Sequence, residues 1–286
     1  MPGRKAAVLG SPIAHSLSPA MHRAAYAELG LDGWSYEAIE CAEAGLPGLL
    51  ERCGPDWAGL SLTMPLKRAV LPLLDDTDPV AELTGGANTV VFRDGARHGY
   101  NTDVAGLVTA LTEAGLDRAG RGVSPADAVI LGAGATACSA LAALDELGVH
   151  RVAVAVRDPA RAVDLVAVAG RLSVAVSLHP YGEKNLGDGA ELVLSTVPGA
   201  GADPYAGQLG MLARPPRIVM DVVYHPWPTA LAAAAQAAGL VTVGGFEMLL
   251  HQAARQVELM TGHPAPVQAM RMAGQEALTS NNLTSK

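Results

Sequence analysis

Lys67 is the residue whose type and position point most directly to chemistry. It ends the segment Ser-Leu-Thr-Met-Pro-Leu-Lys at residues 61–67, in a chain that contains only four lysines. Pro65 suits the first turn of a helix, so we predict a helix that begins near Met64 and holds Lys67 in its first turn. The positive end of the helix dipole repels an ammonium group, which favours proton transfer near neutral pH. On this stretch alone, a solvated surface lysine is an equally good interpretation.

Further polar residues follow predicted strands, where the ligands of α/β proteins gather. His15, Ser16 and Ser18 lie on the loop after the first strand. Ser18 precedes Pro19 and is also typical of a helix N-cap, whereas Ser16 has no such local role. Asp103 follows a strand and opens a helix, so a capping role is open for it as well. Asn88 places an amide in a loop, which alone indicates little.

A glycine-rich loop predicts a dinucleotide site. Gly132-x-Gly134-x-x-Ala137 follows an apolar strand and opens a helix, which is the context that makes this pattern informative. Gly132 permits the tight turn, Gly134 lets the backbone approach a diphosphate, and Ala137 lets helix and strand pack closely. The diphosphate then contacts the free N–H groups of the helix start.

The end of the next strand bears on the choice of cofactor. Arg157 stands where an NAD-binding protein usually carries an acid, and Arg161 follows four residues later. Two guanidinium groups favour the 2′-phosphate of NADP. Asp158 could serve as the NAD-type acid, but Asp158-Pro159 is also a good N-cap followed by a first-position proline. The sequence therefore favours NADP over NAD.

The elements that must position these residues alternate between strand and helix. This pattern predicts an α/β protein with two domains, in which a doubly wound Rossmann-type sheet forms the second. We place a substrate-binding domain at residues 1–104 with 247–286 and a dinucleotide-binding domain at 105–246, with a boundary loop at 120–125. The C-terminal helices return to the first domain, and residues 280–286 form a loose polar tail. The predicted strands are 6–10, 35–39, 59–62, 89–93, 98–100, 128–131, 151–156, 173–178, 192–195, 218–222 and 241–243, of which 89–93 and 98–100 form a hairpin across Asp94-Gly95. The predicted helices are 19–29, 104–114, 135–147, 159–169, 229–238, 247–261 and 265–278.

Composition limits the classes of function. Half of the residues are hydrophobic, 17% are charged and the net charge is −8, which excludes global disorder and argues against nucleic-acid or acidic-membrane partners. We see no membrane span and no signal peptide. Three dispersed cysteines indicate a reducing cytoplasm, and eight histidines without ligand spacing make a metal improbable. The sequence does not indicate the oligomeric state, with which a homodimer is compatible.

Taken together, the motifs resemble the shikimate dehydrogenase family. The resemblance extends from residue 7 to about residue 262, in the family's order. It implies reduction of 3-dehydroshikimate by NADPH to shikimate, a step toward chorismate and the aromatic amino acids. The matching stretches are 10–19, 62–67, 87–89, 101–103, 132–135, 221–226 and 245–252.

The resemblance also implies roles for individual residues. Lys67 and Asp103 match the catalytic pair. The residues that match positions for the substrate carboxylate are Ser16, Ser18 and Tyr224, and those that match positions for ring hydroxyls are Thr63, Asn88 and Gln252. The residues that match cofactor positions are Gly132, Ala133, Gly134, Ala135, Thr136, Val156, Arg157, Arg161, Val222, Gly245 and Met248.

Two positions depart from the family pattern. The family usually has Asn where this chain has Ser61, so one contact to the substrate ring is lost or passes through water. The segment that usually reads Asn-Arg-Thr is Val156-Arg157-Asp158 here, which weakens the NADP preference. Alternatives are a quinate or aminoshikimate dehydrogenase, or a regulator that binds dinucleotide without catalysis. A regulator would not need both Lys67 and Asp103.

Overall fold

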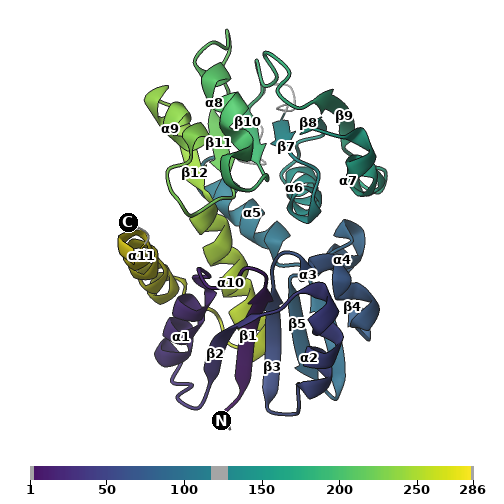
Figure 1. Ribbon diagram of the computed structural model, residues 1–286, viewed down its shortest axis with the longest axis vertical. Coiled ribbons are helices and arrows are strands. Elements are labelled where there is room, and N and C mark those ends of the chain that lie inside the picture. The colour runs from purple at the N-terminus through teal and green to yellow at the C-terminus, as the bar shows by residue number, and fades with distance from the viewer. Residues whose placement is uncertain (1–2, 117–127, 285–286) are drawn as a thin grey trace. The chain divides into compact units, whose positions relative to one another are not determined.

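The order of strands and helices follows the predicted alternation. The computed structural model describes residues 3–116 and 128–284, without the side chains of 281–284, so the predicted boundary loop at 120–125 lies outside the described residues. The chain divides into two units, one of Met1–Gly106 with Leu249–Lys286 and one of Leu107–Met248. Each unit has its own sheet (Figure 1). Helices α5 (Asp103–Glu113) and α10 (Gly245–Thr261) contain the points of division.

The first unit has a six-stranded mixed sheet in the order β2-β1-β3-β5-β6-β4. Its β1 pairs in parallel with β2 and β3, whereas β3–β5 and β5–β6 are antiparallel. The strands are β1 (Lys5–Gly10), β2 (Ser35–Glu40), β3 (Trp57–Leu62), β4 (Asp76–Thr77), β5 (Thr89–Arg93) and β6 (Ala96–Tyr100). Asp94 and Gly95 both have positive φ in the turn between β5 and β6, which confirms the predicted hairpin.

Helices cover both faces of this sheet, because side chains of a strand alternate between its faces. Ala6 and Val8 of β1 pack in a core with Tyr26 of α1. Ala7 and Leu9 pack in a second core with leucines of α2. The helices of this unit, besides parts of α5 and α10, are α1 (Ser18–Glu28), α2 (Leu46–Arg52), α3 (Leu66–Ala69), α4 (Pro79–Thr84) and α11 (Val267–Thr284), with short 3-10 turns at Glu43–Gly45 and Leu71–Leu73.

The second unit has a six-stranded, wholly parallel sheet in the order β12-β11-β10-β7-β8-β9. Its central strands are buried along their whole length, which explains why they appear in the sequence as apolar runs. The strand order reverses between β7 and β10, and ligands of such sheets bind beyond the carboxyl ends of the strands at that point. The strands are β7 (Ala128–Leu131), β8 (Arg151–Val156), β9 (Ala175–Pro180), β10 (Leu192–Ser195), β11 (Ile218–Asp221) and β12 (Val241–Gly244).

Helices α8 and α9 pack on one face of this second sheet, where Tyr205 and Leu231 join Val129 and Val219 in one core. Helix α6 is buried from Ala137 to Leu144, as its small side chains allow. The helices are α6 (Ala135–Glu146), α7 (Val163–Ala169), α8 (Asp203–Leu209) and α9 (Ala230–Ala237), with 3-10 turns at Pro159–Ala162 and Gly199–Ala202.

Several predictions about secondary structure were wrong. The loose tail expected at residues 280–286 is helical as far as Thr284, because α11 is longer than its apolar pattern indicates. The predicted helix 159–169 begins as a 3-10 turn and becomes α-helical at Val163. The short helices α2, α4 and α8 were not predicted. Within residues 3–116 and 128–284, no helix has the length and apolar character needed to cross a bilayer.

Candidate active site

Lys67 and Asp103 form an ion pair in the first unit. Lys67 Nζ donates a hydrogen bond to Asp103 Oδ2 at 2.5 Å. The Asp103 side chain is 4% exposed and that of Lys67 is 17% exposed, so the carboxylate is buried and the ammonium group still reaches solvent. Charge-assisted hydrogen bonds of this kind are stronger than neutral ones and fix the geometry of both groups.

The surroundings of Lys67 differ from the sequence prediction. Helix α3 begins at Leu66, two residues after Met64, with Pro65 as its N-cap, and it has a single turn, Leu66–Ala69. Lys67 does lie in that turn. However, a macrodipole is a sum over aligned peptide groups, and four residues supply little of it. The charge that acts on the ammonium group is therefore the Asp103 carboxylate.

Asn88 and Gln252 lie beside the same carboxylate. Asn88 Nδ2 donates to Asp103 Oδ1 at 2.8 Å, so each oxygen of Asp103 has a different partner. The same amide group lies 3.2 Å from Gln252 Oε1, and both Asn88 and Gln252 are buried. Asp103 is the first residue of α5, but its own N–H donates to Asn101 Oδ1 at 3.0 Å. Asn101 thus satisfies a backbone donor at the start of the helix, while the Asp103 side chain serves the polar cluster.

The loop after β1 carries Ser16 and Ser18 and lies against the segment after β3. Ser11 N–H donates to the Met64 carbonyl at 3.0 Å, and a Cβ on Gly10 would lie 2.3 Å from Thr63 Cγ2. Glycine at position 10 is therefore needed for this close approach. The structure places Ser16, Ser18 and Thr63 on adjacent segments at the carboxyl ends of β1 and β3.

The predicted N-cap role of Ser18 was wrong. Helix α1 begins at Ser18 itself, Leu17 is the N-cap residue, and no side chain caps the helix from that position. The Ser18 N–H instead donates to Ser16 Oγ at 3.3 Å. Ser16, for which the sequence suggested no local role, thus takes part in the turn that leads into α1. Leu17 already has helical φ and ψ, which is why the helix boundary lies one residue from the expected place.

A group of buried polar residues next to Asn88 was not predicted from the sequence. Ser61 is 3% exposed, and its hydroxyl contacts Tyr36 and Gln256. The doubt that the sequence raised about Ser61 concerned a contact to substrate, but this hydroxyl is engaged inside the protein. Gln256 also contacts Thr89, which neighbours Asn88 in sequence. Gln256 lies one helical turn beyond Gln252, and that spacing is the only sequence signal that could have drawn attention to it.

The glycine loop of the second unit has the expected geometry. Gly132 has φ of +104°, and a Cβ there would lie 2.9 Å from Thr196 Oγ1 and from Val197 Cγ1. Gly134 is the N-cap of the twelve-residue helix α6, and a Cβ on it would meet no atom within 4 Å. Ala137 is fully buried where the helix packs. An open space in front of free helical N–H groups fits a dinucleotide diphosphate.

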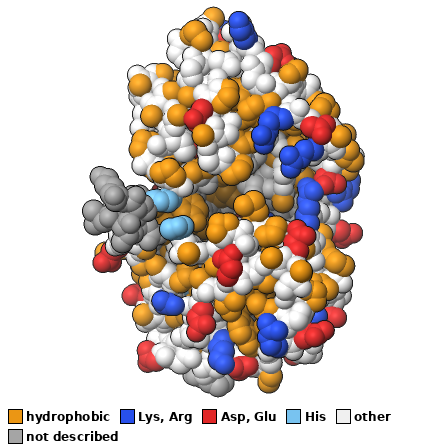
Figure 2. All heavy atoms as spheres, viewed as in Figure 1, with side chains coloured by type: hydrophobic (Ala, Val, Ile, Leu, Met, Phe, Trp, Pro, Cys, Tyr) orange, Lys and Arg blue, Asp and Glu red, His pale blue; other side chains and the backbone are white. Residues whose placement is uncertain are grey.

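The segment after β8 confirms the predicted N-cap role of Asp158. Asp158 is an N-cap, and its carboxylate accepts a hydrogen bond from Ala160 N–H at 2.9 Å. This hydrogen bond therefore engages the Asp158 carboxylate, which could otherwise have contacted a ribose hydroxyl. Arg157 and Arg161 are exposed, so an anion can reach both side chains. Figure 2 shows Lys and Arg side chains gathered along the edge of the second unit that carries α6 and α7.

The remaining predicted cofactor residues lie after β11 and β12. Gly245 packs so tightly on Val222 that a Cβ would lie 1.9 Å from the Val222 carbonyl oxygen. Asp221 holds this loop, because it accepts hydrogen bonds from Thr229 Oγ1 at 2.8 Å and from Val223 N–H at 3.2 Å. Burial raises the pKa of Asp221, against the lowering effect of the hydrogen bond from Thr229.

Three other predicted site residues of this unit are wholly or partly buried. Met248 is 7% exposed and Val156 is 5% exposed at the end of β8. Tyr224 lies in the loop after β11, and burial raises the pKa of its hydroxyl. Tyr224 belongs to the second unit, whereas Ser16 and Ser18 belong to the first.

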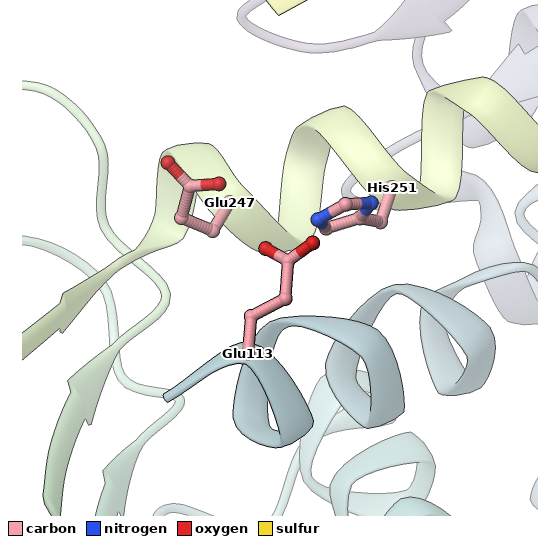
Figure 3. Close-up of side chains that lie close together, drawn as sticks. All are labelled: Glu113, Glu247 and His251. Atoms are coloured by element: carbon pink, nitrogen blue, oxygen red, sulfur yellow. The ribbon is translucent and has the colours of Figure 1, made fainter. Parts of the chain in front are cut away.

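Glu113 and Glu247 place carboxylate oxygens within 4.8 Å of each other, and His251 lies one turn beyond Glu247 on α10 (Figure 3). Carboxylate and imidazole groups are common metal ligands. These side chains are exposed or half-exposed, and groups of exposed acidic residues are frequent without a cation. We assign no metal to them.

A Rossmann-type unit with a dinucleotide loop, joined in one chain to a unit with a partly buried lysine–aspartate pair, defines an NAD(P)-dependent oxidoreductase of the α/β class. Comparison with known proteins gives the family. The profile of the shikimate dehydrogenase substrate binding domain matches residues 8–90, and that of the shikimate 5′-dehydrogenase C-terminal domain matches residues 245–273. The chain belongs to the shikimate dehydrogenase family.

Individual relatives agree over almost the full length. The NADP+ shikimate dehydrogenase of Moorella thermoacetica is 37% identical over 96% of this chain and 94% of its own. The crystal structure of Mycobacterium tuberculosis shikimate dehydrogenase superimposes with a TM-score of 0.85 and 43% identity, covering 96% of this chain and 99% of that one. The Thermus thermophilus enzyme in complex with NADP(H) and shikimate gives a TM-score of 0.81 and 34% identity, with coverage of 96% and 99%.

Proposed function

We propose that this protein catalyses the reversible reduction of 3-dehydroshikimate to shikimate with NADPH, a step in the biosynthesis of chorismate and the aromatic amino acids. The observation that carries this proposal is the ion pair between Lys67 and Asp103, whose Nζ–Oδ2 distance is 2.5 Å. It places a proton donor and an orienting carboxylate in one polar cluster. The family to which the chain belongs supports the substrate and the cofactor.

Lys67 donates a proton to the oxygen of the reacting carbonyl. Hydride transfer to the carbonyl carbon is the chemistry that NADPH supplies when bound. Negative charge then develops on the carbonyl oxygen and needs a proton, which Lys67 Nζ donates. Because Lys67 is 17% exposed, it can regain a proton from solvent, which balances the consumption of one proton per turnover. In the reverse direction, Lys67 removes the hydroxyl proton of shikimate.

The other site residues hold the substrate. Asp103 orients Lys67 and accepts a hydrogen bond from a neighbouring ring hydroxyl. Thr63, Asn88 and Gln252 contact the ring hydroxyls. The residues for the substrate carboxylate are Ser16, Ser18 and Tyr224. A site that recognises hydroxyls by buried polar groups rejects analogues that lack them, because each unpaired buried group costs on the order of 1–3 kcal/mol.

The second unit would hold NADPH. The diphosphate would lie at the start of α6, where the open space at Gly134 fits such a group. The residues that would receive it are Gly132, Ala133, Gly134, Ala135 and Thr136. Arg157 and Arg161 would contact the 2′-phosphate, with Val156 beside the adenosine. Val222, Gly245 and Met248 would line the nicotinamide side.

The proposed partners are thus a small substrate and NADP, with no nucleic acid and no membrane. Three cysteines without disulfide bonds favour a reducing compartment such as the cytoplasm. A homodimer stays a prediction, which light scattering on the purified protein would test.

Purified protein mixed with shikimate and NADP+ should produce the absorbance of reduced nicotinamide. Quinate and NAD+ serve as parallel substrates. Faster turnover with quinate or with NAD+ would contradict the proposed specificity. Binding of NADP+ without turnover of any substrate would favour a regulator that binds dinucleotide without catalysis.

A further inference from the structure

A continuous series of buried hydrogen bonds leads to Asp103, and its first four residues have no role in the proposed function. It begins at Tyr36 of β2, whose hydroxyl contacts Ser61 Oγ at 2.6 Å. Ser61 Oγ lies 2.8 Å from Gln256 Oε1, and Gln256 Nε2 lies 2.9 Å from Thr89 Oγ1. All four residues are at most 3% exposed, so water cannot replace these bonds without cost.

The series continues to the ion pair. Thr89 Oγ1 lies 2.9 Å from Asn88 Oδ1, and Asn88 Nδ2 lies 2.8 Å from Asp103 Oδ1. The other oxygen of Asp103 accepts from Lys67. All members belong to the first unit, so the whole series lies within one structural unit.

The direction of donation along this series is fixed at two points by backbone groups. Gln256 Nε2 also contacts the Asn88 carbonyl oxygen at 3.3 Å, and a carbonyl can only accept. The amide oxygen of Gln256 must therefore face Ser61, so the Ser61 hydroxyl donates to it. Asn88 Oδ1 accepts from Thr102 N–H at 2.8 Å, and an N–H can only donate. The Asn88 amide nitrogen must therefore face Asp103.

These two fixed amides also determine the direction in which the hydroxyl groups of Thr89 and Ser61 donate. Thr89 accepts from Gln256 Nε2, and its one proton then goes to Asn88 Oδ1. Ser61 donates its proton to Gln256, so it accepts from Tyr36. Burial raises the pKa of Tyr36, which keeps this first donor protonated. Every bond in the series then donates toward Asp103, and bonds aligned in this way polarise one another.

We propose that Gln256 is a positioning residue for the lysine–aspartate pair. Through Ser61 on one side and Thr89 on the other, it holds a one-way chain of hydrogen bonds that, together with the Thr102 N–H, fixes the orientation of the Asn88 amide. The oriented amide occupies Asp103 Oδ1 and leaves Oδ2 for Lys67. This inference rests on the proposed function, because it assigns the chain to the proton-transfer step.

The central kinetic test compares two substitutions of Thr89. Thr89→Val keeps the shape and removes the hydroxyl, and Thr89→Ser restores the hydroxyl. We expect Thr89→Val to lower kcat for shikimate oxidation by about tenfold, the equivalent of one lost hydrogen bond, with a smaller change in KM. Thr89→Ser should recover most of this loss. Gln256→Met, which removes both amide contacts, should lower kcat by at least as much as Thr89→Val.

Thermal unfolding of every variant shows which ones fold. If Gln256→Met does not fold, the Thr89 pair decides the outcome. Folded Thr89→Val with kcat within about twofold of the wild type would overturn the proposal, and so would folded Thr89→Ser that recovers nothing. Absence of shikimate oxidation by the wild type would refute the proposed function instead.

A second measurement tests the chain of bonds without activity. The side-chain amide NMR signals of Gln256 are identified as the pair that is missing from the spectrum of Gln256→Met. Tyr36→Phe removes the first donor and should shift this pair. Tyr26→Phe is the matched control, because its hydroxyl is buried in the same cluster without a hydrogen-bond partner among the described residues. Equal effects of Tyr36→Phe and Tyr26→Phe would overturn the directional chain.

Discussion

Lys67 Nζ lies 2.5 Å from Asp103 Oδ2, although the two residues are 36 positions apart in the chain. Lys67 comes from the one-turn helix after β3, and Asp103 is the first residue of α5. Neither element could hold the pair alone, because a four-residue helix is not stable by itself. The sheet that carries β3 and β6 brings them together, and the buried carboxylate fixes the direction of the ammonium group.

Replacement of Lys67 should affect turnover more than substrate binding. In Lys67→Ala we expect kcat for shikimate oxidation to fall by about 10²- to 10⁴-fold, the range that proton transfer by a positioned group contributes. The dissociation constant for shikimate, measured by calorimetry, should change much less. Lys5→Ala is the control, since Lys5 is exposed and pairs with Asp56 at the surface. Equal losses in kcat and in binding would mean that Lys67 is only a binding contact.

Arg157 should set the preference for NADP over NAD. Arg157→Ala removes an exposed guanidinium group that we expect to pair with the 2′-phosphate, so the Kd for NADP+ should rise by about tenfold or more. The Kd for NAD+, which lacks this phosphate, should stay the same. Arg151→Ala is a matched control at the other end of β8. A parallel loss of affinity for both dinucleotides would place Arg157 away from the 2′-phosphate.

The two glycines of the dinucleotide loop should respond differently to alanine. Gly132 has positive φ and no room for a Cβ, so Gly132→Ala should lower the free energy of unfolding by about 1–3 kcal/mol. Gly134 has φ of −83° and open space in front of it. Gly134→Ala should therefore leave unfolding nearly unchanged and weaken NADP+ binding, because the methyl group occupies the space proposed for the diphosphate.

Urea unfolding and calorimetric titration of NADP+ on both variants separate these effects. Normal NADP+ affinity in Gly134→Ala would show that the diphosphate does not approach this glycine. Unchanged stability of Gly132→Ala would show that the turn has an alternative conformation that tolerates a side chain.

His22 should make the folded state sensitive to acid. It is fully buried and stacks on Tyr36 at a ring distance of 3.9 Å, and neither ring nitrogen makes a hydrogen bond of ordinary geometry to any described residue. Burial lowers the pKa of His22 from 6.5 to about 3, against a smaller raising effect of the Gln256 side chain. The unfolded chain thus binds a proton below pH 6.5 that the folded chain does not bind until about pH 3.

The sign of the effect follows from this difference in proton binding. The contribution of His22 to stability is present above pH 6.5 and is lost as the pH falls toward about 3, by up to about 1.4 kcal/mol per pH unit. His22→Phe should remove this dependence, so its free energy of unfolding should decline less between pH 6.5 and 4 than that of the wild type. Urea unfolding at several pH values measures both slopes. Identical slopes would mean that His22 is protonated in the folded state.

Features that depend on near neighbours in the chain were predictable. Three such features are the turn at Gly132 after β7, the Asp94-Gly95 hairpin and the Asp158 N-cap. Each depends on contacts within a few residues, because φ preferences and capping are decided locally. The alternation of strands and helices was sufficient for the fold class, because a wholly parallel sheet needs helical connections between its strands.

Features that depend on distant residues needed the tertiary structure. The residues around Lys67 suggested that it acts through its own helix, and only the family resemblance paired it with Asp103. The structure shows a single helical turn and places the Asp103 carboxylate of α5 at 2.5 Å from Lys67 Nζ. The sequence suggested that Ser61 makes a weakened contact to the substrate, but its hydroxyl donates a hydrogen bond to Gln256, 195 residues away. Local propensities carry no information about which polar groups will be buried together. Only the packed fold decides that, because a buried hydroxyl must find its partner among the groups that folding brings next to it.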